Sequence, residues 1–410
     1  MSSIAPPAPA SDTEDWKPVA FDTGTAYGRK PRSYKPELAE VGAGTPMGEL
    51  LRRYWHPIGL TADASDTPRQ VRVLGEDLIL FRDTTGRPGL VYPHCAHRGA
   101  SLFYGKVEER GIRCCYHGWL FDVQGHCVEQ PCEADAGART CGKIRQPWYP
   151  VEERYGLVWA YLGPPEKKPV LPRYDALETL DDGEFVDADD HSIGGGGPTI
   201  IPCNWLQHYE NLVDPFHVVI LHSTFSGTQF VEQMGLMPEV KFETVSDGVQ
   251  VVSLRALPEG RTLRRVSQAA LPTLRVIPNP KLASTGRVDS IGWVLPIDDH
   301  SFRIYTAGRV RAKGDLVKVR SRINGKLWEE LTDAEHQRFP GDYEAQVSQG
   351  AVAWHSEEHL ASSDRGIVML RRLLQRQIDA MREGRDPVGV GFDPEAPPVK
   401  FEAGNYMLER

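Results

Sequence analysis

The chain has 410 residues, of which 40% are hydrophobic and 9% aromatic, and its formal net charge is −9. This composition is ordinary for a packed globular protein with one large or two smaller domains. The negative charge gives no basic surface for nucleic acid, and no run approaches the ~20 apolar residues that a membrane span requires. Because the first residues also lack the apolar stretch of a secretory signal, we expect a cytoplasmic protein.

Residues 1–165 are expected to comprise a tail followed by a β-rich domain. The tail covers residues 1–41 and is predicted to be partly disordered, since residues 1–13 are rich in Pro, Ala and Ser. The domain covers residues 42–165 and ends where Pro164 and Pro165 interrupt the pattern. Within it, we predict a short amphipathic helix at 47–54 and strands at 71–81, 90–93, 118–121 and 157–162.

Residues 166–410 are expected to form a second domain of mixed α+β structure. It begins with an acidic connector, 175–190, and a glycine run, 194–197, which is better interpreted as a flexible linker than as a mobile lid. The further predicted elements are a helical segment at 204–222, an antiparallel hairpin formed by 292–297 and 301–306, and long helical periodicity over 343–381.

The cysteines are concentrated in one part of the chain. There are seven, an odd number that argues against a complete disulfide framework, and only Cys203 lies outside the stretch from 95 to 141. Thiolate ligation of a metal is therefore the better interpretation of this stretch.

Two short motifs in that stretch combine cysteine with histidine. Cys95 and His97 form C-x-H, whereas Cys114 and His117 form C-x-x-H. Two such loops can offer two sulfurs to one iron and two imidazole nitrogens to another, which is the ligand set of a Rieske [2Fe–2S] cluster. A structural zinc site uses the same residue types, but zinc fingers pair Cys with Cys and His with His. The mixed motifs therefore predict a [2Fe–2S] cluster.

The residues that flank these motifs resemble those of a known family. Segments 97–100 (HRGA) and 116–119 (YHGW) resemble the cluster loops of Rieske-type oxygenases. The resemblance implies that Arg98, Tyr116 and Trp119 lie around the cluster.

The remaining cysteines of the stretch are expected to have no chemical role. High-potential Rieske proteins join their two cluster loops by a disulfide, and its first-loop position is Ala100 in this chain. Cys115 is therefore expected to be an unpaired packing residue, and the cluster a lower-potential electron relay. Cys127, Cys132 and Cys141 are expected to be structural or exposed.

A second group of candidate ligands follows in the segment 204–222. His217 and His222 lie in an apolar context after Asp214, and two imidazoles with one carboxylate form the facial triad of non-haem Fe(II) enzymes. On an ideal helix two residues five apart point about 140° away from each other. We therefore expect a π-type bulge or a broken turn between the two histidines.

Asp214 allows two interpretations. It precedes Pro215, so it can cap a helix in which proline occupies the first turn. The positions of Asn204, Trp205, Glu210, Asn211, Asp214 and both histidines, however, match the mononuclear-iron motif of Rieske oxygenases. In that family the acid at this place links the two metal centres, and the resemblance implies this bridging role for Asp214 and a catalytic role for Asn211.

The third iron ligand must come from elsewhere in the chain. Segment 341–367 resembles the C-terminal part of the phthalate-dioxygenase-like branch, with Asp342 at the ligand position. The alternative is that Asp342 only caps the helix after Pro340 and Gly341, and this interpretation stays open. Alternative acids in the same segment are Glu357, Glu358 and Asp364.

The resemblance extends from about residue 42 to residue 374 and implies fold, cofactors and partners. It implies a β-rich Rieske domain joined to a catalytic domain of helix-grip type, in which helices flank an antiparallel sheet. It also implies a homotrimer that contains a [2Fe–2S] cluster and Fe(II) and receives electrons from a separate NAD(P)H-dependent reductase, directly or through a ferredoxin. No G-x-G-x-x-G fingerprint follows a predicted strand, in agreement with a separate reductase.

The expected reaction is O₂ activation at Fe(II) to O-demethylate or hydroxylate an aromatic acid or phenol. The alternative is angular or ring dioxygenation of a diaryl ether or phthalate-like substrate. Two other classes are a Rieske electron carrier without catalysis and a zinc-stabilised binding module. For a substrate carboxylate, four strand arginines are equally plausible partners: Arg255, Arg275, Arg303 and Arg309.

Overall fold

The computed structural model describes residues 32–190, 197–282, 285–318 and 323–409. The prediction of a disordered segment at 1–13 lies outside these residues, as does the predicted linker at 194–197 except for Gly197. No helix in the described ranges is both long and apolar enough to cross a membrane.

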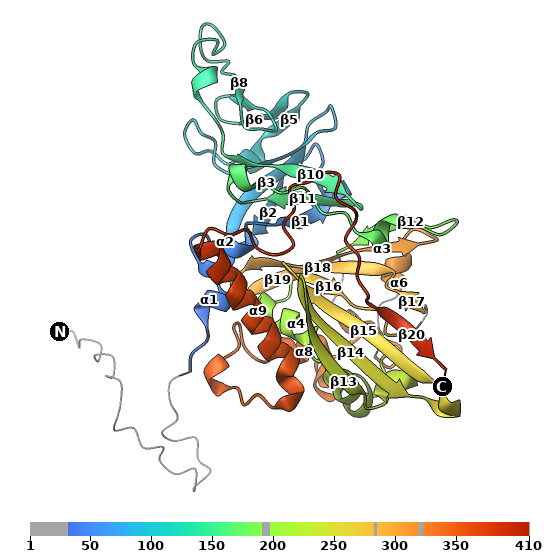
Figure 1. Ribbon diagram of the computed structural model, residues 1–410. Coiled ribbons are helices and arrows are strands. Elements are labelled where there is room, and N and C mark those ends of the chain that lie inside the picture. Colours follow the sequence, from blue (N-terminus) through green and yellow to red (C-terminus); the bar gives the residue numbers. More distant parts are fainter. Residues whose placement is uncertain (1–31, 191–196, 283–284, 319–322, 410) are drawn as a thin grey trace, which may run out of the picture.

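The N-terminal half contains three small antiparallel sheets, which occupy the upper part of Figure 1. Their strand orders are β1-β11-β10, β2-β3-β4-β9 and β5-β6-β7-β8. The strands are β1 Trp55–Leu60, β2 Arg69–Val73, β3 Glu76–Arg82, β4 Pro88–Val91, β5 Lys106–Glu108, β6 Gly111–Arg113, β7 Leu120–Phe121, β8 Cys127–Glu129, β9 Trp148–Tyr149, β10 Val151–Arg154 and β11 Leu157–Tyr161.

The C-terminal half contains one large antiparallel sheet with the order β12-β19-β18-β16-β15-β14-β13, to which β17 and β20 add at one side. Its β18–β19 hairpin pairs Pro296 with Phe302, which confirms the predicted hairpin. The strands are β12 Phe185–Asp189, β13 Glu239–Val245, β14 Gly248–Ala256, β15 Thr262–Ala270, β16 Leu274–Val276, β17 Gly286–Arg287, β18 Ser290–Asp298, β19 Ser301–Val310 and β20 Gly404–Leu408.

Helices accompany this large sheet, as the expected α+β class requires. The longest, α9, buries Leu370, Leu373, Leu374 and Ile378 at helical spacing and packs against β13 and β14. The helices are α1 Pro36–Ala39, α2 Pro46–Leu51, α3 Asp175–Glu178, α4 Trp205–Asn211, α5 His217–Val219, a π-helix Ile220–Phe225, α6 Asp315–Lys318, α7 Asp333–Arg338, α8 Asp342–Val347 and α9 Arg365–Arg382.

Two expectations about local structure were wrong. The helical periodicity over 343–381 is not one helix: α8 ends at Val347, near Gly350 with its positive φ of 103°, and α9 begins only at Arg365. The acidic segment 175–190 is not a simple connector either. It contains α3 and β12, and β12 pairs with β19 along its whole length.

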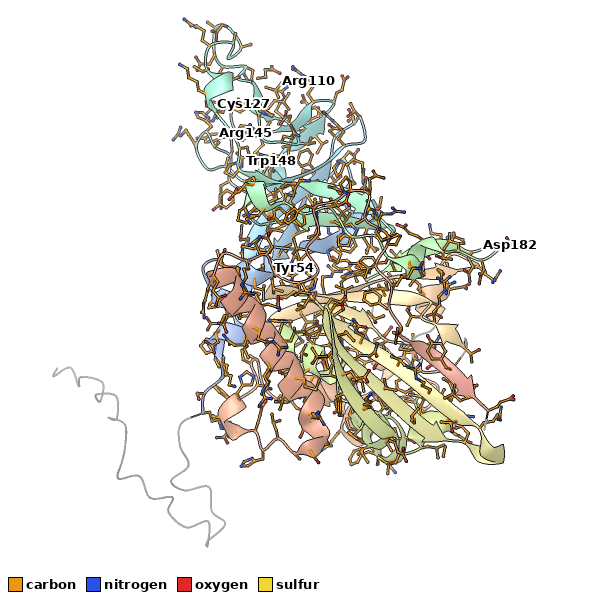
Figure 2. The ribbon with its side chains drawn as sticks, viewed as in Figure 1. Tyr54, Arg110, Cys127, Arg145, Trp148 and Asp182 are labelled. Carbon is orange, nitrogen blue, oxygen red and sulfur yellow. The ribbon has the colours of Figure 1, made fainter. Side chains whose placement is uncertain are left out.

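The two halves share one hydrophobic core. It runs from Leu38 in α1 to Ala403 and includes Trp159 of β11 and Trp293 of β18, whose rings meet at 90° with centroids 5.0 Å apart. Tyr54, labelled at the junction in Figure 2, is buried there and donates a hydrogen bond to the Val388 carbonyl. Residues 32–41 of the predicted tail thus include a helix that packs into this core. The division of the chain at residues 42 and 165 remains a proposal.

Candidate active site

The two cysteine–histidine motifs form loops with matching backbone hydrogen bonds. In the first, Cys95 N–H donates to Ala100 O (2.9 Å) and Gly99 N–H donates to Cys95 O (2.8 Å). In the second, Cys114 N–H donates to Trp119 O (2.8 Å) and Gly118 N–H donates to Cys114 O (3.0 Å). Gly99 and Gly118 have φ values of 77° and 73°, which other residues rarely adopt. The two loops are therefore structural equivalents.

The side chains of these loops separate sulfur from nitrogen. Cys95 and Cys114 are buried, whereas the His97 and His117 rings are half-buried with centroids 4.6 Å apart. Trp119 stacks on His97, with centroids 4.3 Å apart and planes 6° from parallel. Two sulfurs inside and two imidazoles at the rim suit a cluster that has thiolates on one iron and imidazoles on the other.

Tyr116 and Arg98 extend this group toward solvent. The ring centroids of Tyr116 and His117 are 3.9 Å apart, and the Arg98 Cζ atom lies 5.8 Å from the centroid of the Tyr116 ring. Both side chains are exposed, so they surround the loops at their outer edge, as the resemblance implied.

A glutamine that the sequence did not single out supports the first loop. Buried Gln146 accepts a hydrogen bond from Ala96 N–H (2.8 Å) and donates to the carbonyls of Tyr92 (2.8 Å) and His94 (2.9 Å). These three bonds satisfy the amide and fix the backbone on both sides of Cys95.

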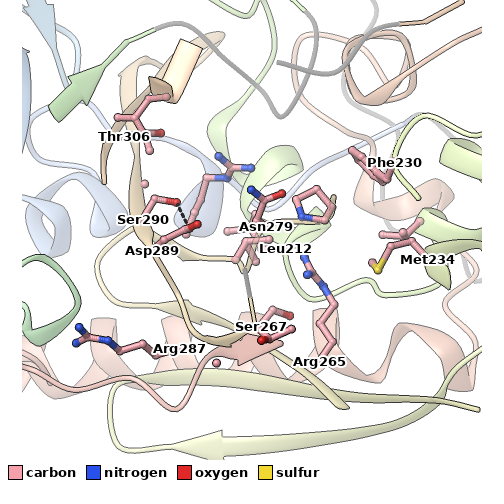
Figure 3. Close-up of a pocket in the computed structure, with 18 of the residues that line it drawn as sticks. Leu212, Phe230, Met234, Arg265, Ser267, Asn279, Arg287, Asp289, Ser290 and Thr306 are labelled. Atoms are coloured by element: carbon pink, nitrogen blue, oxygen red, sulfur yellow. Dashed lines mark hydrogen bonds between the residues drawn. The ribbon is translucent and has the colours of Figure 1, made fainter. Parts of the chain in front are cut away.

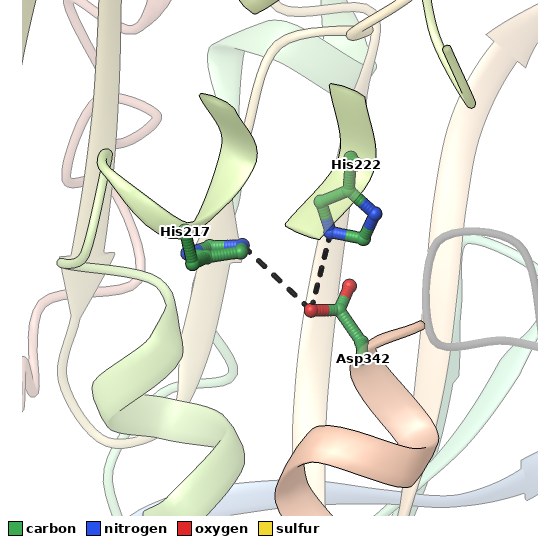
Figure 4. A group of neighbouring side chains, drawn as sticks. All are labelled: His217, His222 and Asp342. Atoms are coloured by element: carbon green, nitrogen blue, oxygen red, sulfur yellow. Dashed lines mark ion pairs between the residues drawn. The ribbon is translucent and has the colours of Figure 1, made fainter. Parts of the chain in front are cut away.

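The three candidate iron ligands, His217, His222 and Asp342, lie close together in the fold. Asp342 Oδ1 lies 3.3 Å from His222 Nε2 and 3.7 Å from His217 Nε2 (Figure 4). One ligand atom from each residue lies within 4.8 Å of the others, and among the described residues this is the one such group with three or more candidate ligands. Two imidazoles and one carboxylate on one side are the donor set of a facial-triad Fe(II) site.

The π-helix explains how His217 and His222 can converge. His222 lies within Ile220–Phe225, directly after the short α5 that begins at His217. The wider π turn brings residues five apart onto one side, and the two ring centroids are 5.4 Å apart. The expected departure from ideal helical geometry is confirmed.

Asp342 does not cap α8. The residue before the helix is Gly341, whose N–H is bonded by the Glu344 carboxylate, while Asp342 directs its own carboxylate at the histidines. Burial alone would raise the pKa of Asp342, but the two histidines outweigh burial and hold it well below its usual value. Of the alternative acids, Glu358 pairs with Arg371 and Asp364 accepts from Ala361 N–H (2.7 Å).

Comparisons with known proteins agree with this pair of sites. Residues 54–147 match the model of the Rieske [2Fe-2S] domain. The chain is 52% identical over 395 residues to the phenoxybenzoate dioxygenase subunit alpha of Ectopseudomonas oleovorans, a match that covers 94% of this chain and 95% of the relative. The chain belongs to the Rieske oxygenase family.

Other members of the Rieske oxygenase family are more distant. The phthalate 4,5-dioxygenase oxygenase subunit of Pseudomonas putida is 30% identical over 86% of this chain and 87% of its own length. Among solved structures, NdmA of Pseudomonas putida CBB5, as a QL mutant with caffeine, has a TM-score of 0.60 at 20% identity and matches 86% of this chain and 99% of its own. That likeness supports the fold.

Family membership establishes the general activity and cofactors. The chain is the α subunit of a Rieske oxygenase, an oxidoreductase that uses a [2Fe–2S] cluster and a mononuclear iron. A carrier without catalysis and a zinc-stabilised binding module are therefore excluded.

In this Rieske oxygenase Asp214 lies two residues before Phe216, the residue that precedes α5, and contacts both the backbone and the His217 ring. Its Oδ1 accepts from the N–H groups of Phe216 (2.9 Å) and His217 (3.3 Å), and its Oδ2 lies 3.5 Å from His217 Nδ1. Burial tends to raise the pKa of Asp214, but its contacts with His217 and the Phe216 N–H together outweigh burial and lower the pKa. Asp214 is therefore not the cap residue with Pro215 in the first turn, because α5 begins only at His217; its carboxylate bonds the backbone N–H groups there and contacts a candidate ligand.

Two polar side chains of α4 lie near the triad: Asn211, for which the resemblance implied a catalytic role, and His208, which had no clear signal in the sequence. Asn211, at the end of α4, places its amide nitrogen 3.3 Å from both His217 Nε2 and Asp342 Oδ1. His208, one turn earlier, is buried and bonds through Nδ1 to Gln346 Oε1 (3.0 Å). His208 belongs to the motif region, but only its contact with α8 distinguishes it from an ordinary core histidine.

A cavity of about 780 Å³ adjoins the triad, which contributes to its lining (Figure 3). Its apolar wall includes Leu212, Val218, Phe230, Met234 and Ile277. Phe230 lies beside His222, with ring centroids 4.8 Å apart. An aromatic substrate in this cavity can therefore reach the position that the triad surrounds.

The four strand arginines that were equally plausible in the sequence lie in different surroundings in the fold. Arg255, Arg275 and Arg309 line the cavity, whereas Arg303 does not and instead pairs with Asp190. Arg265, which the sequence analysis did not consider, also lines the cavity.

The remaining cysteines of this Rieske oxygenase form no disulfide, and all seven lie within the described residues. Cys115 is exposed, so the expectation of a packing residue was wrong: the second loop turns its side chain outward between Cys114 and Tyr116. Cys127 and Cys141 bring their sulfurs to 3.5 Å, and Cys132 lies 3.7 Å from the His117 carbonyl.

Proposed function

We propose that this chain is the terminal oxygenase of a multicomponent system that adds O₂ to a carboxylated diaryl ether. The observation that carries the proposal is the 52% identity, over nearly the whole of both chains, to a phenoxybenzoate dioxygenase subunit. The aromatic and apolar wall beside the triad and the arginines of the same cavity fit such a substrate. Diaryl ether dioxygenation, the alternative in the sequence analysis, thus becomes the leading hypothesis.

In the proposed assignment, each centre has its own ligands. Cys95, His97, Cys114 and His117 hold the [2Fe–2S] cluster, and the second group of ligands, His217, His222 and Asp342, holds Fe(II). Bound there, the metals supply one-electron transfer and O₂ activation.

The protein side chains around the iron ligands have positioning roles in this proposal. Asn211 donates its amide N–H to Asp342 and restrains it, while Phe230 and Met234 hold the substrate ring and exclude water. Asp214 orients the His217 ring.

We further propose that electrons cross between subunits of a homotrimer. The strands around the cluster loops, β5, β6 and β8, lie in the upper part of Figure 1, whereas α4 and α8 lie in the lower half of the molecule, beyond the sheets formed by β1 and β18. Large side chains are exposed near both centres: Tyr104 (71%) and Tyr116 (57%) near the cluster loops, and Ile220 (51%) and Phe225 (65%) on the π-helix. Such exposed apolar side chains fit an interface that covers them.

In this arrangement Asp214 bridges His217 to His117 of the neighbouring subunit. A cytoplasmic NAD(P)H-dependent reductase, directly or through a ferredoxin, supplies the electrons. The relatives that are described as oxygenase subunits support a separate reductase.

The reaction can be tested with 3-phenoxybenzoate, a surrogate reductase and ¹⁸O₂. Dioxygenation at the ether carbon and its neighbour consumes one O₂, two electrons and two protons. The resulting hemiketal expels phenol and leaves a dihydroxybenzoate. We expect both labelled atoms in the dihydroxybenzoate and none in the phenol. A single labelled atom in a product that keeps its ether bond would contradict the proposal.

The second candidate is O-demethylation of a methoxylated aromatic acid. It is favoured by 35% identity to the 5,5'-dehydrodivanillate O-demethylase oxygenase subunit of Sphingobium sp., over 87% of this chain and 82% of the relative. Formaldehyde release from methoxybenzoates, without turnover of 3-phenoxybenzoate, would establish this activity instead.

A further inference from the structure

Three adjacent strands carry arginines into the cavity from one face of the sheet. Arg255 lies on β14, Arg265 on β15 and Arg275 on β16. Arg265 is directly opposite Ser253, two residues before Arg255, and Arg275 is opposite Ala269, so the pairing places the three side chains on one face. Figure 3 shows Arg265 entering the cavity near Met234.

These arginines differ in how many partners they have. Arg265 donates to Asn405 Oδ1 (2.9 Å) and to the Pro278 carbonyl (2.6 Å), so both its Nη atoms are engaged. Arg255 donates only through Nε, to the Leu236 carbonyl (3.0 Å), and its buried Nη1 has no partner among the described residues. The side chain of Arg275 makes no hydrogen bond to the described part of the chain, and its Nε is buried.

None of the three forms an ion pair with a described carboxylate, although other arginines of the cavity do. Arg309, for example, pairs with Glu184 at 3.1 Å. Burial lowers the pKa of Arg255 to about 10 and, against the opposing effect of the Asp342 charge, that of Arg275 to about 10. Burial and the nearby charge of Arg255 lower the pKa of Arg265 to about 9. All three guanidinium groups therefore remain cationic at neutral pH.

A buried cation without a counter-ion is costly unless a ligand supplies the opposite charge. A carboxylate does so with the geometry that matches a guanidinium fork. Because Arg255 is only 1% exposed, its free Nη1 is accessible to such a group from the cavity rather than from the surface. The arginine charges and the triad line the same cavity, so one small molecule can contact both.

We propose that Arg255 and Arg275 form a carboxylate-binding subsite that anchors the acid group of the substrate. Arg265, fixed by Asn405 and Pro278, reinforces the positive field. The proposal rests on the proposed function, in that the substrate is an aromatic acid. With the carboxylate held there and a ring against Phe230, the subsite determines which ring carbons face the triad.

The test compares two ligands of similar shape, 3-phenoxybenzoate and uncharged diphenyl ether. Their dissociation constants are measured by equilibrium dialysis with the iron-loaded protein and without reductase. In Arg255→Gln and Arg275→Gln, affinity for the acid should fall about 10- to 100-fold, since a hydrogen bond to a charged group is lost. Affinity for diphenyl ether should change by less than about threefold.

The matched control is Arg311→Gln. Arg311 lines the same cavity, but its side chain is 63% exposed and it contacts Glu184 and Asp182. This variant should bind both ligands like the wild type. Arg255→Lys and Arg275→Lys keep the charge without the planar fork, so they should bind the acid with intermediate affinity and also provide test variants if a glutamine variant does not fold.

The possible outcomes distinguish failure of the carboxylate subsite from failure of the proposed oxygenase reaction. Unchanged acid affinity in folded, iron-containing variants at both arginines would overturn the subsite. Equal loss of both ligands would also overturn it, because the arginines would then shape the cavity rather than bind the acid. If the wild type binds 3-phenoxybenzoate in an arginine-dependent way but does not oxidise it, the proposed function fails and the carboxylate subsite stands.

Discussion

His208 Nδ1 lies 3.0 Å from Gln346 Oε1, and this buried hydrogen bond joins α4, which carries Asn211, to α8, which carries Asp342. Gln207 reinforces the junction by donating to the carbonyls of Gln346 (2.8 Å) and Gly350 (3.1 Å). Because α8 has only six residues, these bonds restrain the helix that positions Asp342. The contact between His208 and Gln346 is thus an outer support of the candidate iron site.

Replacing Gln346 by alanine should therefore weaken iron binding. Loss of the amide leaves His208 without its buried partner and loosens the contact between α4 and the last turn of α8, so we expect about 10-fold lower affinity for mononuclear Fe(II). The measurement is an Fe(II) titration of protein stripped of mononuclear iron, with the cluster spectrum as internal reference. Gln349→Ala, on an exposed part of the same segment, is the control and should titrate like the wild type.

Asp342→Ala removes the carboxylate of the proposed triad. We expect the iron content to fall from about three to about two atoms per chain, with turnover lost and the visible spectrum of the cluster retained. The control is Asp364→Ala, which removes an acid that accepts a hydrogen bond from Ala361 N–H. If iron and turnover persist in Asp342→Ala, another acid is the ligand.

His117→Cys tests the proposed cluster ligation. If the variant keeps a [2Fe–2S] centre, its reduction potential should be lower, because a thiolate stabilises the ferric state more than a neutral imidazole does. The potential is measured by a redox titration of the visible spectrum. Cys115→Ser changes an exposed neighbour of Cys114 and should leave the potential unchanged. The same potential in wild type and His117→Cys would rule out His117 as a ligand.

Asp214→Asn separates the backbone hydrogen bonds of Asp214 from electron transfer. Asparagine can still accept from the Phe216 N–H, whereas the negative charge beside His217 is lost. Both metal centres and the oligomer should survive, but oxidation of the reduced cluster in a single turnover with substrate and O₂ should become much slower. Wild-type kinetics would exclude the bridging role, and loss of the fold or of the oligomer would favour a purely structural role.

Stability should fall in mild acid because of His56. This histidine is fully buried with Nε2 2.8 Å from the Leu51 carbonyl, and burial lowers its pKa to about 4. The unfolded chain, with a pKa near 6.5, binds the proton first. Between pH 6.5 and 4 the free energy of unfolding should therefore drop by up to about 1.4 kcal/mol per pH unit from this residue.

His56→Gln should reduce that pH dependence. The urea midpoint at pH 7 and at pH 5.5 is compared in both proteins, and the difference should be smaller in the variant. An equal difference would mean that other groups account for the acid sensitivity of the fold.

The sequence by itself determined the features that depend on the spacing of residues within a short segment of the chain. The four candidate cluster ligands lie on two loops of a few residues each, so spacing alone indicates the chemistry. The separation of five residues between His217 and His222 required an irregular helix, and the π-helix follows from it. Hairpin alternation in β18 and β19 was equally visible, because cross-strand neighbours there are also near in sequence.

Only the tertiary structure decided the features that depend on burial and on distant partners. Capping was a serious alternative for Asp342 until α8 and the π-helix were seen to face each other. Gln146 and His208 are ordinary residues whose roles come from partners far away in sequence. In the sequence, the four strand arginines could not be distinguished, because all four carry the same charge and lie on predicted strands. In the fold, Arg303 and Arg309 form ion pairs with carboxylates. Arg255 and Arg275 form no ion pair with a carboxylate of the described residues.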